Sequence, residues 1–128
     1  MTGMRTDLAG RGRLISIIAA ALLIISLFIS APSTGGIFIP PWDKLAHFAF
    51  YGAIAFLLAM GLGRSRLVSA LLLTCLVGIA DEAYQAILPE RQADVMDLLT
   101  DFTAAVIVIL FVKFATASTR QKNLLRDR

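Results

Sequence analysis

The chain has 128 residues, of which 58% are hydrophobic and only 16% are charged, whereas a soluble domain is roughly half apolar and a quarter charged. Its formal net charge of +3 does not indicate nucleic-acid binding, because the basic residues form no patch or stripe on a soluble face. The composition therefore predicts an integral membrane protein, and the single cysteine, Cys75, excludes an internal disulfide and a cysteine metal cluster.

Four apolar stretches are long enough to cross a bilayer, whose core of about 30 Å needs about 20 helical residues for each crossing. They cover residues 14–31, 45–62, 67–88 and 95–115, and the connections between them are short and rich in Gly, Pro or basic residues. Each crossing must satisfy its own backbone, and none of the stretches shows the alternation of a barrel strand. We therefore predict an all-α fold, a four-helix transmembrane bundle.

The first stretch has a second interpretation as a signal peptide, because basic residues precede it and Ala31 stands near a candidate cleavage point. Its 18 apolar residues exceed the roughly 7–15 of a signal peptide, so an uncleaved anchor is favoured. On this interpretation a membrane domain of residues 14–115 lies between a cytoplasmic tail of residues 1–13 and a basic cytoplasmic tail of residues 116–128.

Basic and acidic residues fall on opposite sides of the predicted bundle. If the N-terminus is inside, ten of the twelve Lys and Arg residues lie inside, and only Lys44 and Arg91 lie outside. Two acidic residues lie inside and seven toward the outer side, so the formal charge is +8 on the inner side and −5 on the outer side. Because cytoplasmic loops retain Lys and Arg, we predict that both termini are cytoplasmic.

Polar residues recur at helical spacing at the outer ends of the last three predicted helices. A charged side chain that faces lipid at the bilayer centre costs at least about 2.5–3.5 kcal/mol. We therefore expect the three polar faces to meet around a pocket that opens to the outer side. The residues on these faces are Lys44, His47 and Tyr51 on the second helix, Asp81 and Gln85 on the third, and Asp94, Asp97 and Asp101 on the fourth.

Several of these residues also have simpler interpretations. Asp43 is expected to cap the N-terminus of the second helix, because Asp is a favoured N-cap. Lys44 can reach the lipid head groups as readily as it can line a pocket. Glu90 and Asp94, in or beside a loop, are expected to be solvated charges. The buried polar residues can also form a self-paired network that only fixes the register of the helices.

Three motifs occur in a fixed order: DKLAHFAFY at residues 43–51, DEAYQ at residues 81–85, and an arginine followed by DLLTD at residues 97–101. Together they resemble the VanZ-like family of small bacterial membrane proteins, over about residues 40–110. The family pattern is Asp-Lys-x-x-His-Phe-x-x-Tyr, Asp-Glu-x-x-Gln, Gly-Arg and Asp-x-x-x-(Asn/Asp). This chain departs from it with Glu90 before the arginine and Ala104 in the last helix, where the family usually has glycine.

The resemblance implies a multi-pass protein of the bacterial cytoplasmic (inner) membrane. The family's named member resembles an accessory factor that lowers susceptibility to the glycopeptide antibiotic teicoplanin, but the family at large has no settled reaction, and the resemblance does not imply that this chain confers resistance. The family's polar residues fall on Asp43, Lys44, His47, Tyr51, Asp81, Glu82, Gln85, Arg91, Asp97 and Asp101.

One histidine beside several carboxylates can act as general base and acid, or can bind a divalent metal. The sequence has neither an HExxH motif nor a second histidine for the common zinc sites, so the metal and any cofactor stay unassigned. Transport is disfavoured, because residues 67–80 of the third helix contain few polar groups. The candidate catalytic residues are His47, Asp81 and Asp97, and the candidate ligand-binding residues are Lys44, Tyr51, Glu82, Gln85, Arg91 and Asp101.

Two functions stay open, and neither involves nucleic acid. The first is a cell-envelope protein whose outward-facing pocket binds or modifies an amphiphile, such as a membrane lipid or a lipid-linked envelope precursor. The second is a non-enzymatic module in which the polar network fixes helix packing and the surface recruits other membrane proteins. Neither alternative defines an oligomeric state, and whether the protein is an enzyme is left open.

Overall fold

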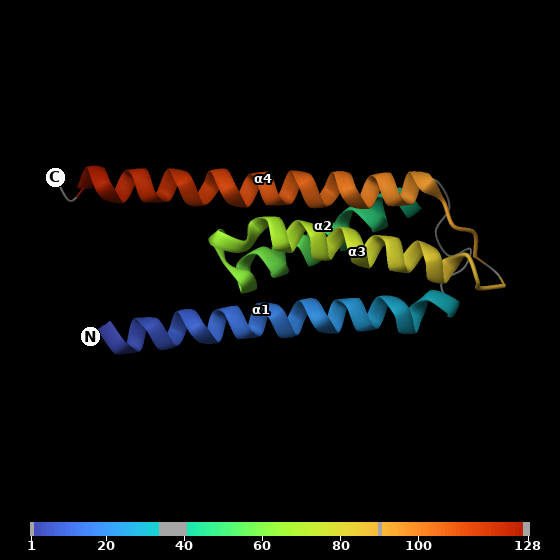
Figure 1. Cartoon of the computed structure of the whole chain (residues 1–128), viewed down its shortest axis with the longest axis horizontal. Coiled ribbons are helices and arrows are strands. Elements are labelled where there is room, and N and C mark those ends of the chain that lie inside the picture. The colour runs from blue at the N-terminus through green and yellow to red at the C-terminus, as the bar shows by residue number, and fades with distance from the viewer. Residues whose placement is uncertain (1, 34–40, 90, 127–128) are drawn as a thin grey trace.

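The computed structural model describes residues 2–33, 41–89 and 91–126, with side chains described between residues 7 and 118. Four long helices account for most of these residues: α1 (Thr2–Ser30), α2 (Trp42–Leu62), α3 (Leu67–Gln85) and α4 (Val95–Arg126). Two short 3-10 helices follow α1 and α2, namely η1 (Ala31–Ser33) and η2 (Arg64–Arg66). In Figure 1, α2 and α3 lie between α1 and α4, and both chain ends lie at the same end of the bundle.

The predicted all-α four-helix bundle is confirmed, because each predicted stretch coincides over most of its length with a helix that is long and apolar enough to cross a membrane. The protein is therefore a multi-pass membrane protein. The candidate spans are Asp7–Ser33, Trp42–Leu62, Arg64–Gln85 and Val95–Ser118.

Some predicted helix boundaries were wrong. Helix α3 ends at Gln85 rather than at residue 88, since the N–H groups of Ile87 and Leu88 bond to carbonyls three residues back and form tight turns before Pro89. Helices α1 and α4 extend beyond their apolar stretches, because no proline interrupts residues 2–30 or 95–126. Both run past the turn between α2 and α3 in Figure 1.

Small residues line the contacts between helices, and large apolar residues face outward. Ala55, Ala70 and Ala104 are each 0% exposed, so Ala104 fits closely at the position where glycine is usual. In contrast, Ile29 and Phe111 are 74% and 66% exposed. This distribution is typical of membrane bundles, in which small side chains let helices approach and large ones contact lipid. Helix α2 is central, because it packs extensively against each of the other three, whereas α3 makes only a small contact with α1.

Helices α1 and α2 approach closely at Gly61. A Cβ atom at this position would lie 2.6 Å from Ile17 Cγ1 and 3.3 Å from the carbonyl oxygen of Arg13. We expect Gly61→Leu to lower the free energy of unfolding by about 1–3 kcal/mol, because the added side chain must push α1 away. Thermal unfolding in detergent, followed by circular dichroism, measures the change.

Gly10→Leu is the matched control for this overpacking, because a Cβ at Gly10 has nothing within 4 Å. Its melting temperature should stay at the wild-type value. Equal melting temperatures for the Gly10 and Gly61 variants would contradict the close contact between α1 and α2.

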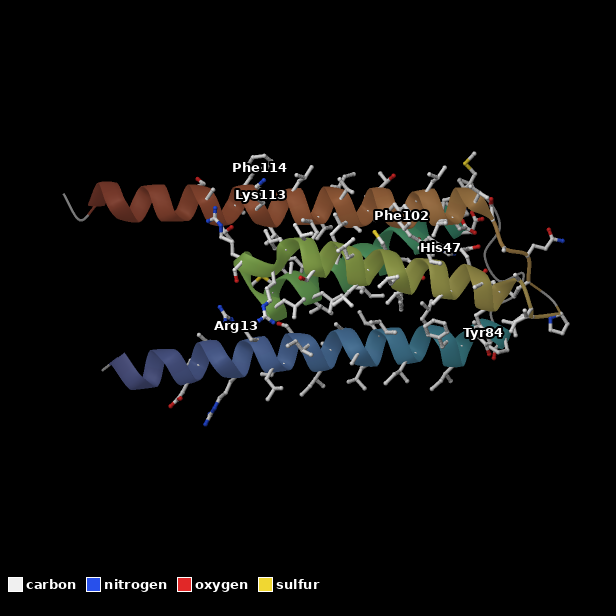
Figure 2. All side chains as sticks on the ribbon, viewed as in Figure 1. Arg13, His47, Tyr84, Phe102, Lys113 and Phe114 are labelled. Carbon is white, nitrogen blue, oxygen red and sulfur yellow. The ribbon has the colours of Figure 1, made fainter. Side chains whose placement is uncertain are left out.

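The labelled charged residues separate along the bundle. Figure 2 shows Arg13 and Lys113 toward the end that carries the chain termini, and His47 and Tyr84 toward the end where α3 connects to α4. The latter end holds most of the polar residues that the sequence singled out.

Candidate functional site

Polar side chains of α2, α3 and the start of α4 form three neighbouring hydrogen-bonded sets, which we together call the polar cluster. Tyr51, Asp81, Gln85 and Asp101 are each at most 3% exposed, so these polar groups lie inside the bundle. The members of the cluster are Lys44, His47, Tyr51, Asp81, Glu82, Gln85, Asp94, Asp97 and Asp101.

Lys44 connects α2 to the start of α4. Its Nζ donates hydrogen bonds to Asp94 Oδ2 and to Asp97 Oδ1, both at 2.5 Å. Asp94 also accepts a hydrogen bond of 2.8 Å from the N–H of Met96, which caps α4. The expectation that Asp94 is only a solvated charge was therefore wrong, although its side chain is 45% exposed. Lys44, followed by the Met96 N–H, holds the pKa of Asp94 below its ordinary value.

His47 lies between two carboxylates of α4. Its Nδ1 is 3.0 Å from Asp101 Oδ1, which is a hydrogen bond, and its Nε2 is 3.8 Å from Asp97 Oδ2, which is too far for one. In the tautomer with the proton on Nδ1, the Nδ1–H donates the hydrogen bond to Asp101, and Nε2 has a lone pair on the side of Asp97. This arrangement fixes the orientation of the imidazole ring.

Asp81 is fully buried and is bonded to two neutral groups. Its Oδ2 accepts one hydrogen bond from the Tyr51 hydroxyl and one from Gln85 Nε2, both at 3.0 Å. Gly78 provides room for this part of the cluster, since a Cβ there would lie 3.3 Å from Asp101 Oδ2 and 3.5 Å from Tyr51 Cε1. Glycine at this position lets α3 approach both α2 and α4.

Glu82 reaches the loop before α4, where its Oε2 accepts a hydrogen bond of 2.8 Å from the N–H of Asp94. Arg91, in the same loop, is half-buried, and its side chain forms no hydrogen bond or ion pair within the described part of the chain. The structure thus brings together every predicted site residue except Arg91, and it adds Asp94.

The cluster holds more acceptors than donors. Three buried carboxylate oxygens, Asp81 Oδ1, Glu82 Oε1 and Asp101 Oδ2, have no hydrogen-bond partner among the described residues. A buried charged group without a partner is costly, so these oxygens can accept donors from a ligand or bind a cation. His47, Glu82 and Asp97 could hold a metal ion, because one ligand atom from each lies within 4.8 Å of the others.

Asp43 does not cap α2, so that expectation was wrong. The helix begins at Trp42, with Pro41 at the N-cap position and no side-chain capping bond. Asp43 lies in the first turn, where its Oδ1 accepts a hydrogen bond of 2.8 Å from the N–H of Lys44. Because α2 begins at Trp42, Asp43 lies inside the first turn rather than at the N-cap position, where its side chain could cap the helix.

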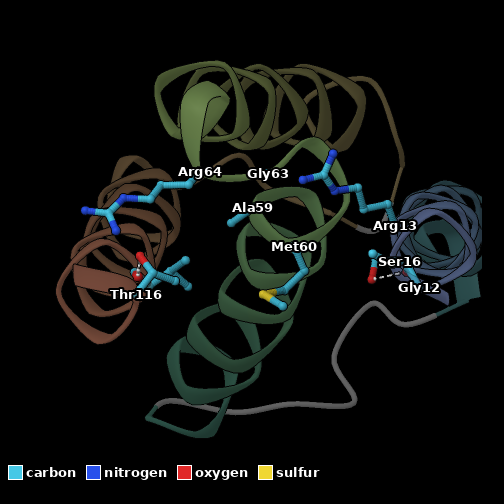
Figure 3. A pocket seen from close by; sticks show the side chains of 10 residues that line it. Gly12, Arg13, Ser16, Ala59, Met60, Gly63, Arg64 and Thr116 are labelled. Atoms are coloured by element: carbon cyan, nitrogen blue, oxygen red, sulfur yellow. Dashed lines mark hydrogen bonds between the residues drawn. The ribbon is translucent and has the colours of Figure 1, made fainter. Parts of the chain in front are cut away.

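A groove of about 380 Å³ lies at the other end of the bundle, between α1, the end of α2 and α4. Figure 3 shows the Arg13 side chain reaching from α1 toward Gly63, whereas the Arg64 side chain extends from the turn after α2 to the other side, toward α4. Gly63 has a positive φ of 82°, and a Cβ there would lie 3.2 Å from a terminal guanidinium nitrogen of Arg13. The sequence identified Arg64 only as an orientation signal and did not predict this groove.

Comparison with known proteins supports the resemblance seen in the motifs. The sequence matches the family model described as VanZ/LLP1 over residues 9–116. No curated protein and no solved structure matches the chain. The family match covers the whole polar cluster and most of each spanning helix, so the chain belongs to the VanZ/LLP1 family.

Proposed function

We propose that this protein binds an amphiphilic component of the bacterial cell envelope, with the polar head at the polar cluster and the apolar tail along the outer faces of the helices. One observation carries the proposal: polar groups buried within a membrane bundle have unfilled hydrogen-bonding capacity. Within the bundle they are the unpartnered oxygens of Asp81, Glu82 and Asp101, and the loop before α4 adds a donor, Arg91 Nε.

These groups define the chemistry of the head group. The carboxylate oxygens need donors, such as hydroxyl or amine groups, and Arg91 needs an anionic acceptor. A phosphate-containing lipid or lipid-linked precursor has both. Large apolar side chains near the cluster are exposed, including Met96 at 60% and Leu99 at 51%, and they provide a surface for the tail.

The cluster is also equipped for proton transfer to or from a bound head group. Asp101 orients His47, whose Nε2 then acts as the general base. Asp97 Oδ2 lies 3.8 Å from that nitrogen, and Asp81 bonds to Tyr51, whose ring stacks on His47. His47, Asp81 and Asp97 therefore keep their proposed catalytic roles, and Lys44, Tyr51, Glu82 and Gln85 position them.

Lipid binding by the purified protein tests the proposal. Native mass spectrometry in detergent should detect bound phosphatidylglycerol, which has hydroxyl donors, or polyprenyl phosphate, whose monoanion has one P–OH donor, but no bound phosphatidylcholine, whose head group lacks donors. We expect Arg91→Gln to weaken this binding about tenfold or more, because it removes a charge-assisted hydrogen bond.

Arg66→Gln is the matched control, since Arg66 is exposed at the opposite end of the bundle. It should bind these lipids like the wild type. Binding that does not distinguish the three lipids, or an equal loss in both arginine variants, would reject the proposed head-group site.

The direct pairing within the cluster favours a second function, in which the network fixes the packing of a non-enzymatic interaction module. His47→Gln separates the two, because glutamine keeps a polar group but cannot act as a base near neutral pH. If a ligand is bound, the variant should lose its effect on teicoplanin susceptibility at normal membrane abundance. If the cluster only fixes packing, the effect should follow abundance.

We further propose that the protein lies in the bacterial inner membrane with both termini in the cytoplasm. An even number of candidate spans and the basic character of the terminal end support this orientation. Fusions at either terminus should make green fluorescent protein fluoresce and leave alkaline phosphatase inactive. A phosphatase inserted at Ala93 should be active. The reverse pattern would move the polar cluster to the cytoplasmic side.

A further inference from the structure

We propose that His47, Glu82 and Asp97 bind one divalent transition-metal ion, with Zn²⁺ or Mn²⁺ as the best match to one imidazole and two carboxylates. The three residues come from α2, α3 and α4, so the ion would join three helices. One ligand atom from each lies within 4.8 Å of the others. Further contacts indicate which atoms face the ion.

His47 is held by one nitrogen and free at the other. Its Nδ1 is hydrogen-bonded to Asp101 Oδ1 at 3.0 Å, and Asp101 is itself buried. Metal-binding histidines commonly donate their second ring N–H to a carboxylate in this way, which fixes the tautomer and makes the other nitrogen more basic. Nε2 is therefore the ligand atom, and Asp101 positions it. While Nε2 holds the ion its lone pair is occupied, so His47 would act as a general base only in the metal-free protein.

Asp97 is divided in the same way between a fixed oxygen and a free one. Its Oδ1 accepts the hydrogen bond from Lys44, whereas its Oδ2 lies 3.8 Å from His47 Nε2. That separation is too long for a hydrogen bond, but two metal bonds of about 2.0–2.2 Å can span it.

Glu82 provides evidence for a bound ion that the grouping of acidic residues alone would not provide. The residue is only 7% exposed, and its Oε2 is fixed by the N–H of Asp94 at 2.8 Å. Its Oε1 is buried and accepts no hydrogen bond from any described residue. A buried carboxylate oxygen normally has a partner, and a metal ion would be that partner.

The charge of the cluster also favours a cation. Five carboxylates face Lys44 and a His47 that is neutral when it binds metal, so a divalent ion offsets negative charge that the described residues leave unbalanced. The ion would also attract a phosphate head group, which five carboxylates alone repel. In this respect the inference rests on the proposed function, although metal binding itself requires no amphiphile.

Metal titration without added lipid tests the site. The full chain, purified with a tag that lacks histidine and stripped with EDTA, should bind one Zn²⁺ or Mn²⁺ ion per chain in calorimetry. We expect Glu82→Gln to weaken binding more than about 100-fold, and Asp101→Asn to weaken it about tenfold, since losing an outer partner typically lowers metal affinity 10–100-fold.

Glu82→Gln should fold, because its amide oxygen can still accept the N–H of Asp94. As a second measurement, added metal should raise the melting temperature of the wild type but not that of Glu82→Gln. Tyr84→Phe, a change on α3 outside the cluster, should keep the metal-dependent increase.

Wild-type protein that binds no more metal than Glu82→Gln would overturn the metal site. If this protein still retained phosphatidylglycerol or polyprenyl phosphate, only the metal inference would fail. If the protein bound one ion but retained neither lipid, the metal site would stand and the proposed amphiphile binding would fail.

Discussion

Tyr51→Ala is expected to lower the free energy of unfolding by about 3–5 kcal/mol. Tyr51 is 1% exposed, its ring stacks on that of His47 with centroids 6.0 Å apart, and its hydroxyl bonds to Asp81. Since lipid tails are as apolar as side chains, the loss comes mainly from van der Waals contacts inside the bundle. Reversible unfolding in mixed detergent micelles measures the difference.

Tyr51→Phe isolates the contribution of the hydroxyl group. It should cost about 1–3 kcal/mol, because Asp81 loses one of its two donors while the ring remains. Tyr84→Phe is the matched control, since the Tyr84 ring contacts Phe28 but its hydroxyl has no hydrogen bond within the described chain. Equal stability of the two Phe variants would show that the bond to Asp81 does not stabilise the fold.

Lys44→Met is expected to lower the free energy of unfolding by about 3 kcal/mol, because it leaves two carboxylates without their cation. Most of this loss should come from Asp97, whose side chain is 11% exposed, whereas water screens the more exposed Asp94. Adding Asp97→Asn to Lys44→Met should therefore restore part of the stability. A double variant that is less stable than Lys44→Met would contradict the pairing.

The same ion pair predicts a dependence on pH. Because the pKa of Asp94 is lowered in the folded protein, its pairing stabilises the fold above the ordinary value of 3.8. This stabilisation is lost as the pH falls from that value through the lowered pKa. In Lys44→Met this pH dependence should become smaller, because the Met96 N–H still lowers the pKa of Asp94, and acid titration of the melting temperature in detergent can detect the change.

The sequence was sufficient to predict the helices and most of the cluster, because both depend on local spacing and on the cost of charge in lipid. His47 follows Lys44 by three residues and precedes Tyr51 by four, so one face of α2 is defined without tertiary information. Asp81 and Asp101 interrupt apolar stretches, which makes a lipid-facing position too costly.

Other features depend on tertiary contacts that spacing does not encode. The position of the first turn of α2 decides whether Asp43 can cap it, and Lys44 decides whether Asp94 is solvated or paired. Arg91 lies in a loop without periodicity, so its separation from the cluster could not be predicted. The direct bonds within the cluster depend on side-chain length and on the rotation of each helix.

The residues that pair within the cluster are synthesised at different times, because they lie far apart in the sequence. The hydrogen bonds that join α2 to the rest of the cluster connect residues from 30 positions apart, for Tyr51 and Asp81, to 54 positions apart, for His47 and Asp101. Lys44 is therefore synthesised well before its partner Asp97 in α4, and Glu82 is synthesised before Asp94, whose backbone N–H bonds to it. Until the last helix inserts, the nascent chain holds unpaired charges in the membrane, and these charges distinguish an incomplete chain from a finished one.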